Sequence, residues 1–262
     1  MNRRSWIATA GAVTLAAAAS SRGRAQTPAT LRVGATPFNT YAEAYYAQDL
    51  GIFKKAGLNV EITSFNNGPA IAAAVASGSL DVGISTPISL AQAVTRGVPF
   101  PIVAGGAMNT MKATAMMLLV GSDAPLHGPK DFEGKTIALS ALKTVSELGI
   151  DVWLARGGVD PAKVRIIEIP LPEMGAAIER GTVAAALVAE PALSVAKAGG
   201  KVRELANPFG MIAPEFLLSA WFSTAPFIQK NPVLMKTFAA AIHETGKWAN
   251  GHHDEYMVIL AK

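Results

Sequence analysis

The sequence predicts an α/β protein of two similar lobes, in which each lobe has a mostly parallel sheet flanked by helices. Apolar runs typical of buried strands alternate with short segments of helical spacing. This alternation occurs twice, and its landmarks recur 101 to 104 residues apart: Thr36 and Ser140, Gly57 and Gly158, Gly78 and Gly181. Similar physics selects similar residues in any two such runs, so the common ancestry of the halves stays open.

The first half contains four predicted strands and three predicted helices. The strands are apolar runs at 31–36, 59–65, 81–85 and 101–108. The first helix, 41–57, has helical apolar spacing and stops at Gly57. The second, 68–78, carries Pro69 in its first turn, where proline is favoured, and the third covers 87–96.

The second half repeats this order. Its strands are expected at 135–140, 163–169 and 183–189, and its helices at 145–156, 172–180 and 191–197. Residues 105–117 are the expected first crossing between the lobes, and 215–226 the return crossing. The predicted division is 31–112 plus 222–262 for one lobe and 113–221 for the other. Two crossings permit a hinge that closes around a ligand.

Residues 1–25 resemble an export signal, with Arg3 and Arg4 at the start, an alanine-rich middle and a cleavage site after Ala25. The two arginines are typical of the twin-arginine route, and an ordinary secretory signal is the alternative. The apolar middle is too short to span a bilayer comfortably. We expect a protein exported to the periplasm.

The charge of the chain argues against a nucleic-acid partner. Lysine and arginine total 23 against 19 acidic residues, but four arginines lie within the first 25 positions. The remainder is therefore formally neutral and has no basic stripe suited to a phosphate backbone. Cysteine is absent, which excludes disulfides and a cysteine nucleophile.

Small polar residues follow most of the strands, at the points where helices are expected to begin. In open α/β sheets, ligands bind beyond the carboxyl ends of the strands, where helix N-termini present N–H groups and a partial positive charge. Any one of these residues is individually more typical of a helix cap than of a ligand contact. Their convergence predicts a cleft that holds a polar or anionic group without metal or cofactor. The candidate ligand-binding residues are Thr36, Phe38, Asn39, Asn67, Gly68, Ser85, Thr86, Met108, Ser140, Lys143, Thr144 and Glu190.

Three of these candidates have specific alternatives. Lys143 could neutralise an anion or could be a solvated loop residue. Glu190 could accept a hydrogen bond from an amine or a ring N–H, or could cap a helix. Met108 could line an adaptable apolar wall or could simply fill the core.

Catalytic and metal-binding patterns are weak. His252 and His253 precede Asp254, but adjacent residues do not share a helix face, so we expect no metal site there. Neither a nucleophile elbow nor a phosphate-binding loop is present in the sequence. The sequence therefore favours binding over catalysis.

The segments YYAQDLGIFKKAGLNVEI, ASGSLDVGIST and DFEGKTIALS, with the AEP that follows the strand at 183–189, resemble periplasmic substrate-binding proteins of ABC importers. The resemblance is to the nitrate, sulfonate and taurine type, which also includes binders of the thiamine pyrimidine precursor. It implies a type II two-lobed periplasmic-binding fold, a monomer, a small ligand in the cleft, and delivery to a membrane permease. By position, the binding corners of that family fall on 36–39, 67–68, 85–86, 140–144 and Glu190.

Two functions of other classes are alternatives. One is an enzyme that makes the thiamine pyrimidine on the same fold; the resemblance implies cysteine- and histidine-containing motifs for it, which the cleft corners lack. The other is an exported sensor domain that binds the same ligands. The chain ends at EYMVILAK inside an expected helix without a capping glycine, and whether it is a fragment of a longer protein stays open.

Overall fold

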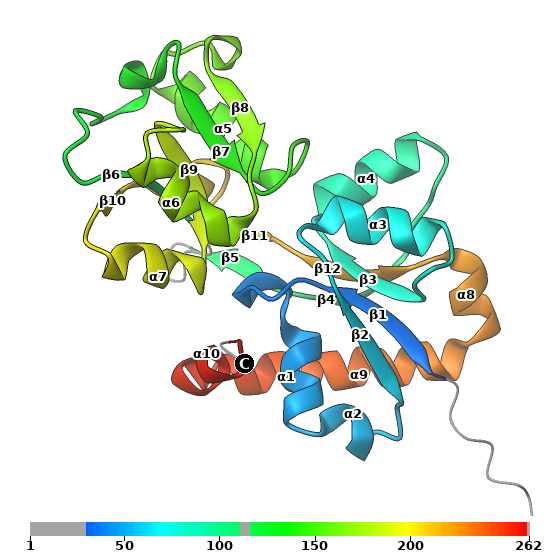
Figure 1. Ribbon diagram of the computed structural model, residues 1–262. Helices are drawn as coiled ribbons and strands as arrows, with labels where there is room; N and C mark the ends of the chain where they lie inside the picture. Colours follow the sequence, from blue (N-terminus) through cyan, green and yellow to red (C-terminus); the bar gives the residue numbers. More distant parts are fainter. Residues whose placement is uncertain (1–29, 111–115, 261–262) are drawn as a thin grey trace, which may run out of the picture.

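A computed structural model describes residues 30–110 and 116–260. Figure 1 shows two bodies of similar plan, one built largely from the green and yellow part of the chain and one from its blue, cyan and orange parts. Each contains a five-stranded sheet, and a small two-stranded sheet lies between them. The two-lobed α/β architecture expected from the sequence is confirmed.

The sheet of the first lobe combines strands from both ends of the described chain. In spatial order its strands are β2 (Val60–Ser64), β1 (Leu31–Ala35), β3 (Val82–Ser85), β12 (Ala220–Ser223) and β4 (Ile102–Gly105). β1 pairs in parallel with β2 and β3, whereas β12 is antiparallel to β3 and β4. Four strands therefore run in one direction, and the strand that follows the return crossing runs in the other.

The sheet of the second lobe has the same plan. Its order is β8 (Arg165–Glu168), β7 (Thr136–Leu139), β9 (Ala185–Ala189), β6 (Met116–Gly121) and β10 (Val202–Ala206). β7 is parallel to β8 and β9, and β6 is antiparallel to β9 and β10. Here too the strand that enters from the crossing is the antiparallel one, so the duplication expected from the spacing holds for topology.

Helices and short 3-10 turns connect the strands and cover the sheets. The α-helices are α1 (Glu43–Asp49), α2 (Ile52–Lys55), α3 (Gly68–Ala76), α4 (Pro87–Thr95), α5 (Val145–Arg156), α6 (Met174–Glu179), α7 (Ala192–Ala198), α8 (Ala225–Lys230), α9 (Pro232–Ala249) and α10 (His253–Leu260). The 3-10 turns are Asn39–Tyr41, Pro129–Phe132, Pro161–Lys163, Leu171–Glu173 and Phe209–Met211. No helix in the described part of the chain is long and apolar enough to cross a membrane.

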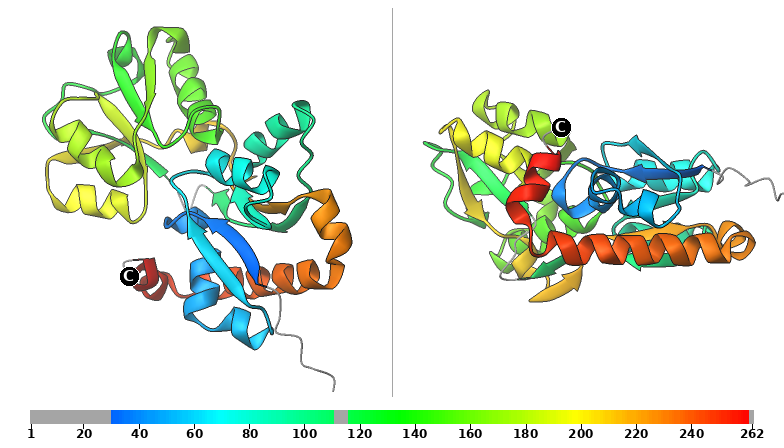
Figure 2. Two further views of the ribbon diagram at one scale, coloured as in Figure 1. Left: turned by 45° about the vertical axis from the view of Figure 1, so that its right-hand side comes forward. Right: turned by 90° about the horizontal axis from the view of Figure 1, so that it is seen from below.

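The single helix expected at 41–57 is wrong. The chain forms α1 and α2 instead, separated at Gly51, whose φ of 69° is left-handed and incompatible with a continuing right-handed helix. The break turns α2 so that Ile52 and Phe53 are buried. Phe53 stacks on Phe238 of α9, with ring centroids 5.9 Å apart. Figure 2 shows α9 running along this lobe and α10 turning off from its end.

The two crossings pair with each other. β5 (Met108–Thr110) and β11 (Glu215–Leu217) form the antiparallel two-stranded sheet of the hinge. Gly106 is needed here for close approach rather than for unusual dihedral angles: a Cβ on it would lie 2.5 Å from Ser219 Oγ and 3.0 Å from the Ser219 carbonyl oxygen. Ser219 Oγ in turn accepts from Ala107 N–H (2.8 Å) and donates to Thr40 O (2.7 Å).

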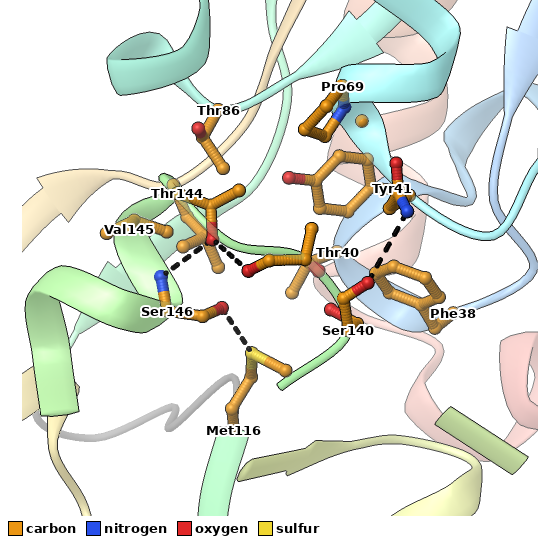
Figure 3. A pocket seen from close by; sticks show the side chains of 14 residues that line it. Phe38, Thr40, Tyr41, Pro69, Thr86, Met116, Ser140, Thr144, Val145 and Ser146 are labelled. Carbon is orange, nitrogen blue, oxygen red and sulfur yellow. Dashed lines mark hydrogen bonds between the residues drawn. The ribbon is translucent and has the colours of Figure 1, made fainter. Parts of the chain in front are cut away.

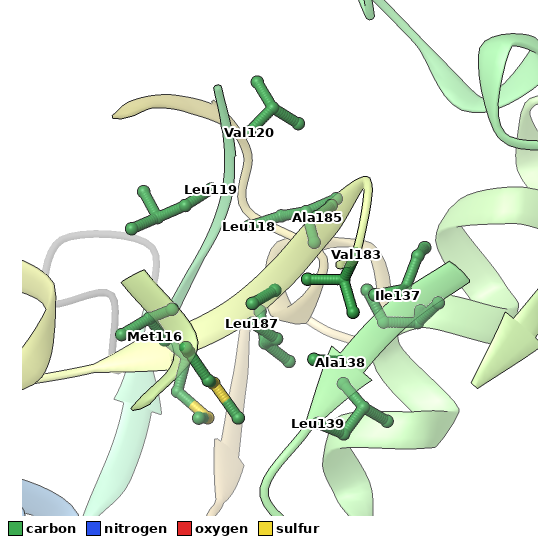
Figure 4. Packing of buried hydrophobic residues seen from close by; sticks show 14 of the residues in the cluster. Met116, Leu118, Leu119, Val120, Ile137, Ala138, Leu139, Val183, Ala185 and Leu187 are labelled. Carbon is green, nitrogen blue, oxygen red and sulfur yellow. The ribbon is translucent and has the colours of Figure 1, made fainter. Parts of the chain in front are cut away.

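Each lobe has its own hydrophobic core. In the second lobe, Leu118, Ile137 and Leu187 belong to a buried cluster around the sheet, part of which Figure 4 shows. The first lobe has a separate cluster that includes Trp221 and Phe238. The predicted lobe boundary at 112/113 lies outside the described residues and that at 221/222 falls within β12, so the exact division stays a prediction. Phe38 packs against both cores, which places it at the junction of the lobes.

Candidate ligand-binding cleft

A small polar cavity of about 30 Å³ lies between the lobes. Figure 3 shows its walls, which come from the starts of helices in both lobes and from the crossing strands. Six of the twelve candidate residues line it: Phe38, Asn67, Gly68, Thr86, Ser140 and Thr144. Helix N-termini from both halves of the chain therefore meet around one space, as the repeat of the strand–helix corner predicts.

In the first lobe, α3 and α4 begin at this cavity. Asn67 caps α3, its Oδ1 accepting from Ala70 N–H at 3.0 Å. Its Nδ2 donates to Ser140 O of the second lobe at 3.4 Å, so the same side chain also bridges the lobes. Thr86 caps α4 by accepting from Ser89 N–H at 3.2 Å. Pro69 and Pro87 carry no N–H, so the first turns of α3 and α4 can offer a ligand the N–H groups of Gly68 and Ile88.

In the second lobe, α5 begins at the same cavity. Thr144 caps it, accepting from Ser146 N–H at 3.3 Å while its hydroxyl donates to Ala141 O at 3.2 Å. The Ser146 hydroxyl lies 3.7 Å from Met116 Sδ, which fixes its position on the wall (Figure 3). With α3 and α4 opposite, α5 adds a third positive helix end, and such ends attract anionic groups.

A second and larger interlobe cavity of about 430 Å³ adjoins the first, because Phe38 lines both. Its walls come from the corners after β1, β2, β8 and β9 and from α6 and α7. Glu190 lies at this cavity. No histidine, lysine or arginine is among the described residues that line either interlobe cavity.

The Glu190 carboxylate is already engaged within its own lobe. Its Oε2 accepts from Ser194 N–H at 3.1 Å, and its Oε1 accepts from the Ser194 hydroxyl at 2.9 Å, which caps α7. Its backbone carbonyl accepts from Asn39 N–H at 3.2 Å. Asn39 and Glu190 thus join the lobes through the main chain, and whether either side chain binds ligand stays a prediction.

Five candidate residues line neither of these two cavities: Thr36, Asn39, Ser85, Met108 and Lys143. Lys143 lines a separate groove of about 290 Å³ whose other walls are mainly α3 and α4, and which Arg96 also lines. Its φ of 57° is left-handed, and its N–H donates to the Glu147 carboxylate. Thr36 and Ser85 are fully buried and line none of the three cavities, while Met108 is half exposed in the hinge strand β5. Their role in binding stays a prediction.

Residues outside the candidate set also line the polar cavity. They are Thr40, Tyr41, Pro69, Met116, Ala141, Val145, Ser146 and Leu218. Most are immediate neighbours of candidate residues, so a wider window around each corner would have included them. Met116 and Leu218 follow the crossings and carry no polar or capping signal that singles them out in the sequence.

The first turn of α1 contains a buried carboxyl group, that of Glu43. Burial raises the pKa of Glu43 to about 8, and hydrogen bonding from its own backbone and from the Trp221 indole opposes the shift. Glu43 Oε2 and Trp221 Nε1 each lack a partner of normal hydrogen-bond geometry among the described residues, so the indole offsets little of the desolvation. Burial also raises the pKa of Tyr41, and Glu43 adds to that shift. Near neutral pH the Glu43 carboxyl group is therefore mostly protonated, and Glu43 lines none of the three cavities.

Metal binding has no support in the geometry. Within residues 30–110 and 116–260, no three histidine, cysteine or acidic side chains are grouped so that they could hold a metal ion. The export signal expected at residues 1–25 lies outside the described residues.

Two lobes, a double crossing and a cleft between helix ends define the fold of periplasmic binding proteins, and solved structures agree. The aliphatic sulphonate binding protein SsuA of Escherichia coli superposes with a TM-score of 0.71 at 21% identity, over 89% of this chain and 78% of that one. The nitrate-binding protein NrtA of Synechocystis PCC 6803 superposes with a TM-score of 0.76 at 20% identity, over 90% of this chain and 66% of that one. At such identities the likeness establishes the fold.

Residues 39–256 match the NMT1/THI5-like family, and the chain belongs to that family. Among curated proteins, it is 28% identical over 188 residues to the taurine-binding periplasmic protein of Escherichia coli strain K12, covering 71% of this chain and 56% of that protein. It is 25% identical over 239 residues to the nitrate import ATP-binding protein NrtC of Synechococcus elongatus, covering 83% of this chain and 35% of that protein. The matches thus span about half, or less, of the length of these relatives.

Proposed function

We propose that the chain is the solute receptor of an ABC importer. It captures a small polar or anionic organic molecule, of the sulfonate, taurine, nitrate or pyrimidine kind, and delivers it to a membrane permease from the periplasm. The observation that carries this proposal is the meeting of capped helix ends from both lobes around one polar cavity. The names of the matched relatives, which include binding proteins for taurine, sulfonate and nitrate, support it.

Recognition of the anion rests on dipoles and hydroxyl groups. The helix ends of α3, α4 and α5 offer N–H groups, and Thr86, Thr144 and Ser146 add hydroxyls around the cavity. To donate to an anion, the Thr144 and Ser146 hydroxyls would turn away from their present acceptors, Ala141 O and Met116 Sδ. Because these donors come from both lobes, a bound anion would hold the lobes together, which is the closed state that a permease would recognise. The twelve candidate residues, including those away from the cavity, remain the proposed contact set.

Binding without catalysis is the favoured mode. An enzyme on this fold would need a nucleophile or a proton-transfer group within reach of the ligand. The described walls of both cavities offer hydroxyls and two carboxylates. Glu190 already accepts two hydrogen bonds from Ser194, and Glu179 pairs with Lys201. The chain has no cysteine. We therefore propose a receptor, and we expect no turnover of bound ligand.

The test is a thermal-shift screen of the protein against sulfonates, taurine, nitrate, aromatic acids and pyrimidines, followed by calorimetry. A ligand at 100 times its dissociation constant should stabilise the fold by about 2.7 kcal/mol, because it binds only the folded state. The Thr86→Ala substitution should weaken the binding of the ligand that gives the largest thermal shift. A screen in which no small acid or polar solute binds, or chromatography that shows the ligand chemically changed, would overturn the receptor assignment.

Import and sensing are separated by uptake. Cells that carry the cognate permease and ATPase should accumulate labelled ligand only when this protein is present. If uptake is independent of the protein while a membrane receptor still responds to the ligand, the sensor alternative holds.

A further inference from the structure

Phe38 divides the interlobe cleft into two compartments of very different size. The polar cavity measures about 30 Å³ and the adjoining cavity about 430 Å³, and the Phe38 side chain lines both. The polar cavity is thus more than ten times smaller than its neighbour and suits a compact group better than a whole organic molecule. The larger cavity falls within the range that holds whole small molecules.

The larger compartment is walled mainly by apolar residues. Two of them are aromatic, Phe38 and Phe65, and four are prolines, namely Pro37, Pro170, Pro172 and Pro191. The two phenyl rings can pack against a planar ring of a ligand, and aromatic pairs gain beyond the area they bury. Among its described lining residues, only Asn66, Glu179 and Glu190 have polar side chains.

Both carboxylates of that compartment are already occupied. Glu190 accepts two hydrogen bonds from Ser194, and Glu179 pairs with Lys201 Nζ at 3.1 Å. Lys201 offsets the charge of Glu179, whereas Glu190 keeps its charge because both of its donors are neutral. An uncharged apolar tail gains from burial against the remaining, apolar walls.

We propose that the ligand of this cleft is an aryl acid, with a compact sulfonate or carboxylate head joined to an uncharged aromatic ring. The head reaches past Phe38 to the helix ends of α3, α4 and α5, and the ring lies in the larger compartment between Phe38, Phe65 and Pro172. The inference rests on the proposed receptor function, because it concerns the same cleft. It goes further in naming an aromatic tail, which taurine and nitrate lack.

Calorimetric titration with four probes tests this assignment. We expect benzenesulfonate or benzoate to bind at least tenfold more tightly than methanesulfonate or taurine, and the comparison of the two aryl acids identifies the head group. Taurine or methanesulfonate binding as tightly as both aryl acids would refute the aryl assignment and leave the receptor function standing. No binding of any probe, together with a negative screen, would refute the receptor function itself.

A substitution that fills the larger compartment with a side chain provides a second, independent test of where the ring binds. Ala176, exposed on α6, lines the larger cavity, and Ala198, exposed on α7, does not. Ala176→Phe should weaken the better aryl acid at least tenfold and leave methanesulfonate within twofold, whereas the matched control Ala198→Phe should change neither. Unchanged aryl affinity in Ala176→Phe, or an equal loss for both probes, would overturn the placement of the ring.

Discussion

Replacing Glu43 with glutamine should raise the stability of the protein at neutral pH and remove most of the pH dependence of its unfolding between pH 5 and 8. Glu43 is 7% exposed, and burial raises the pKa of its carboxyl group from 4.5 to about 8. Tyr41 and Tyr46 are the ionisable groups whose pKa values respond to its charge, and both stay protonated in this range, since burial raises their pKa values. The Glu43 titration therefore proceeds without a compensating change in these neighbours.

The sign follows from proton linkage. Between pH 4.5 and 8 the folded protein retains a proton on Glu43 that the unfolded chain has lost, so the free energy of unfolding falls as pH rises. The slope approaches 1.4 kcal/mol per pH unit, which amounts to about 3 kcal/mol lost by pH 7. Stability from this group is complete below pH 4.5 and is lost by pH 8. Glutamine is neutral at every pH and avoids the loss.

Urea unfolding followed by tryptophan fluorescence at pH 5, 6, 7 and 8 measures this effect. The difference between Glu43→Gln and the wild type should grow with pH, and Glu244→Gln, which removes an exposed carboxylate on α9, is the matched control. Parallel stability curves for wild type and Glu43→Gln across this range would refute the reasoning, because they would mean that Glu43 is ionised without penalty in the folded state.

Three further substitutions test local features. In urea unfolding, the Lys143→Gly variant should be about 0.5–1 kcal/mol more stable than the Lys143→Ala variant. Glycine adopts the left-handed φ of 57° at this position without strain, and alanine does not. Equal stability of the two variants would contradict this. Asp81→Ala should lower the free energy of unfolding by about 1–2 kcal/mol, because the Asp81 carboxylate accepts hydrogen bonds from Arg32 N–H (2.8 Å), Nε (3.1 Å) and Nη2 (2.6 Å). This figure is already reduced for solvent screening, since the Arg32 side chain is 45% exposed. A thermal midpoint equal to that of the wild type would refute it. Thr86→Ala should lower the free energy of unfolding by about 1 kcal/mol, because α4 loses its cap, and should also weaken ligand binding. Thr86→Ser should retain both the stability and the affinity. A loss of stability without a loss of affinity would restrict the role of Thr86 to capping.

The order of elements was accessible from the sequence because its physical signals are local. Buried strands read as continuous apolar runs, and caps such as Asn67, Thr86 and Thr144 mark where helices begin. The spacing between the halves then predicted two lobes of one topology, which the sheets confirm. The broken helix at Gly51 was missed because helical apolar spacing continues across the glycine, and only the packing of Phe53 on α9 reveals the turn.

What the sequence determined by itself is therefore where the polar corners stand along the chain and that they recur in two halves. Which side chains face the ligand was decided by the tertiary structure. Ser85 and Thr86 are adjacent, yet Ser85 packs against Gly68 while Thr86 reaches the cavity, and Lys143 turns into another groove. The division of the cleft by Phe38 likewise exists only once both lobes are in place. Side-chain direction depends on strand register, backbone angles and the contact between lobes, and these arise from residues far apart in the chain.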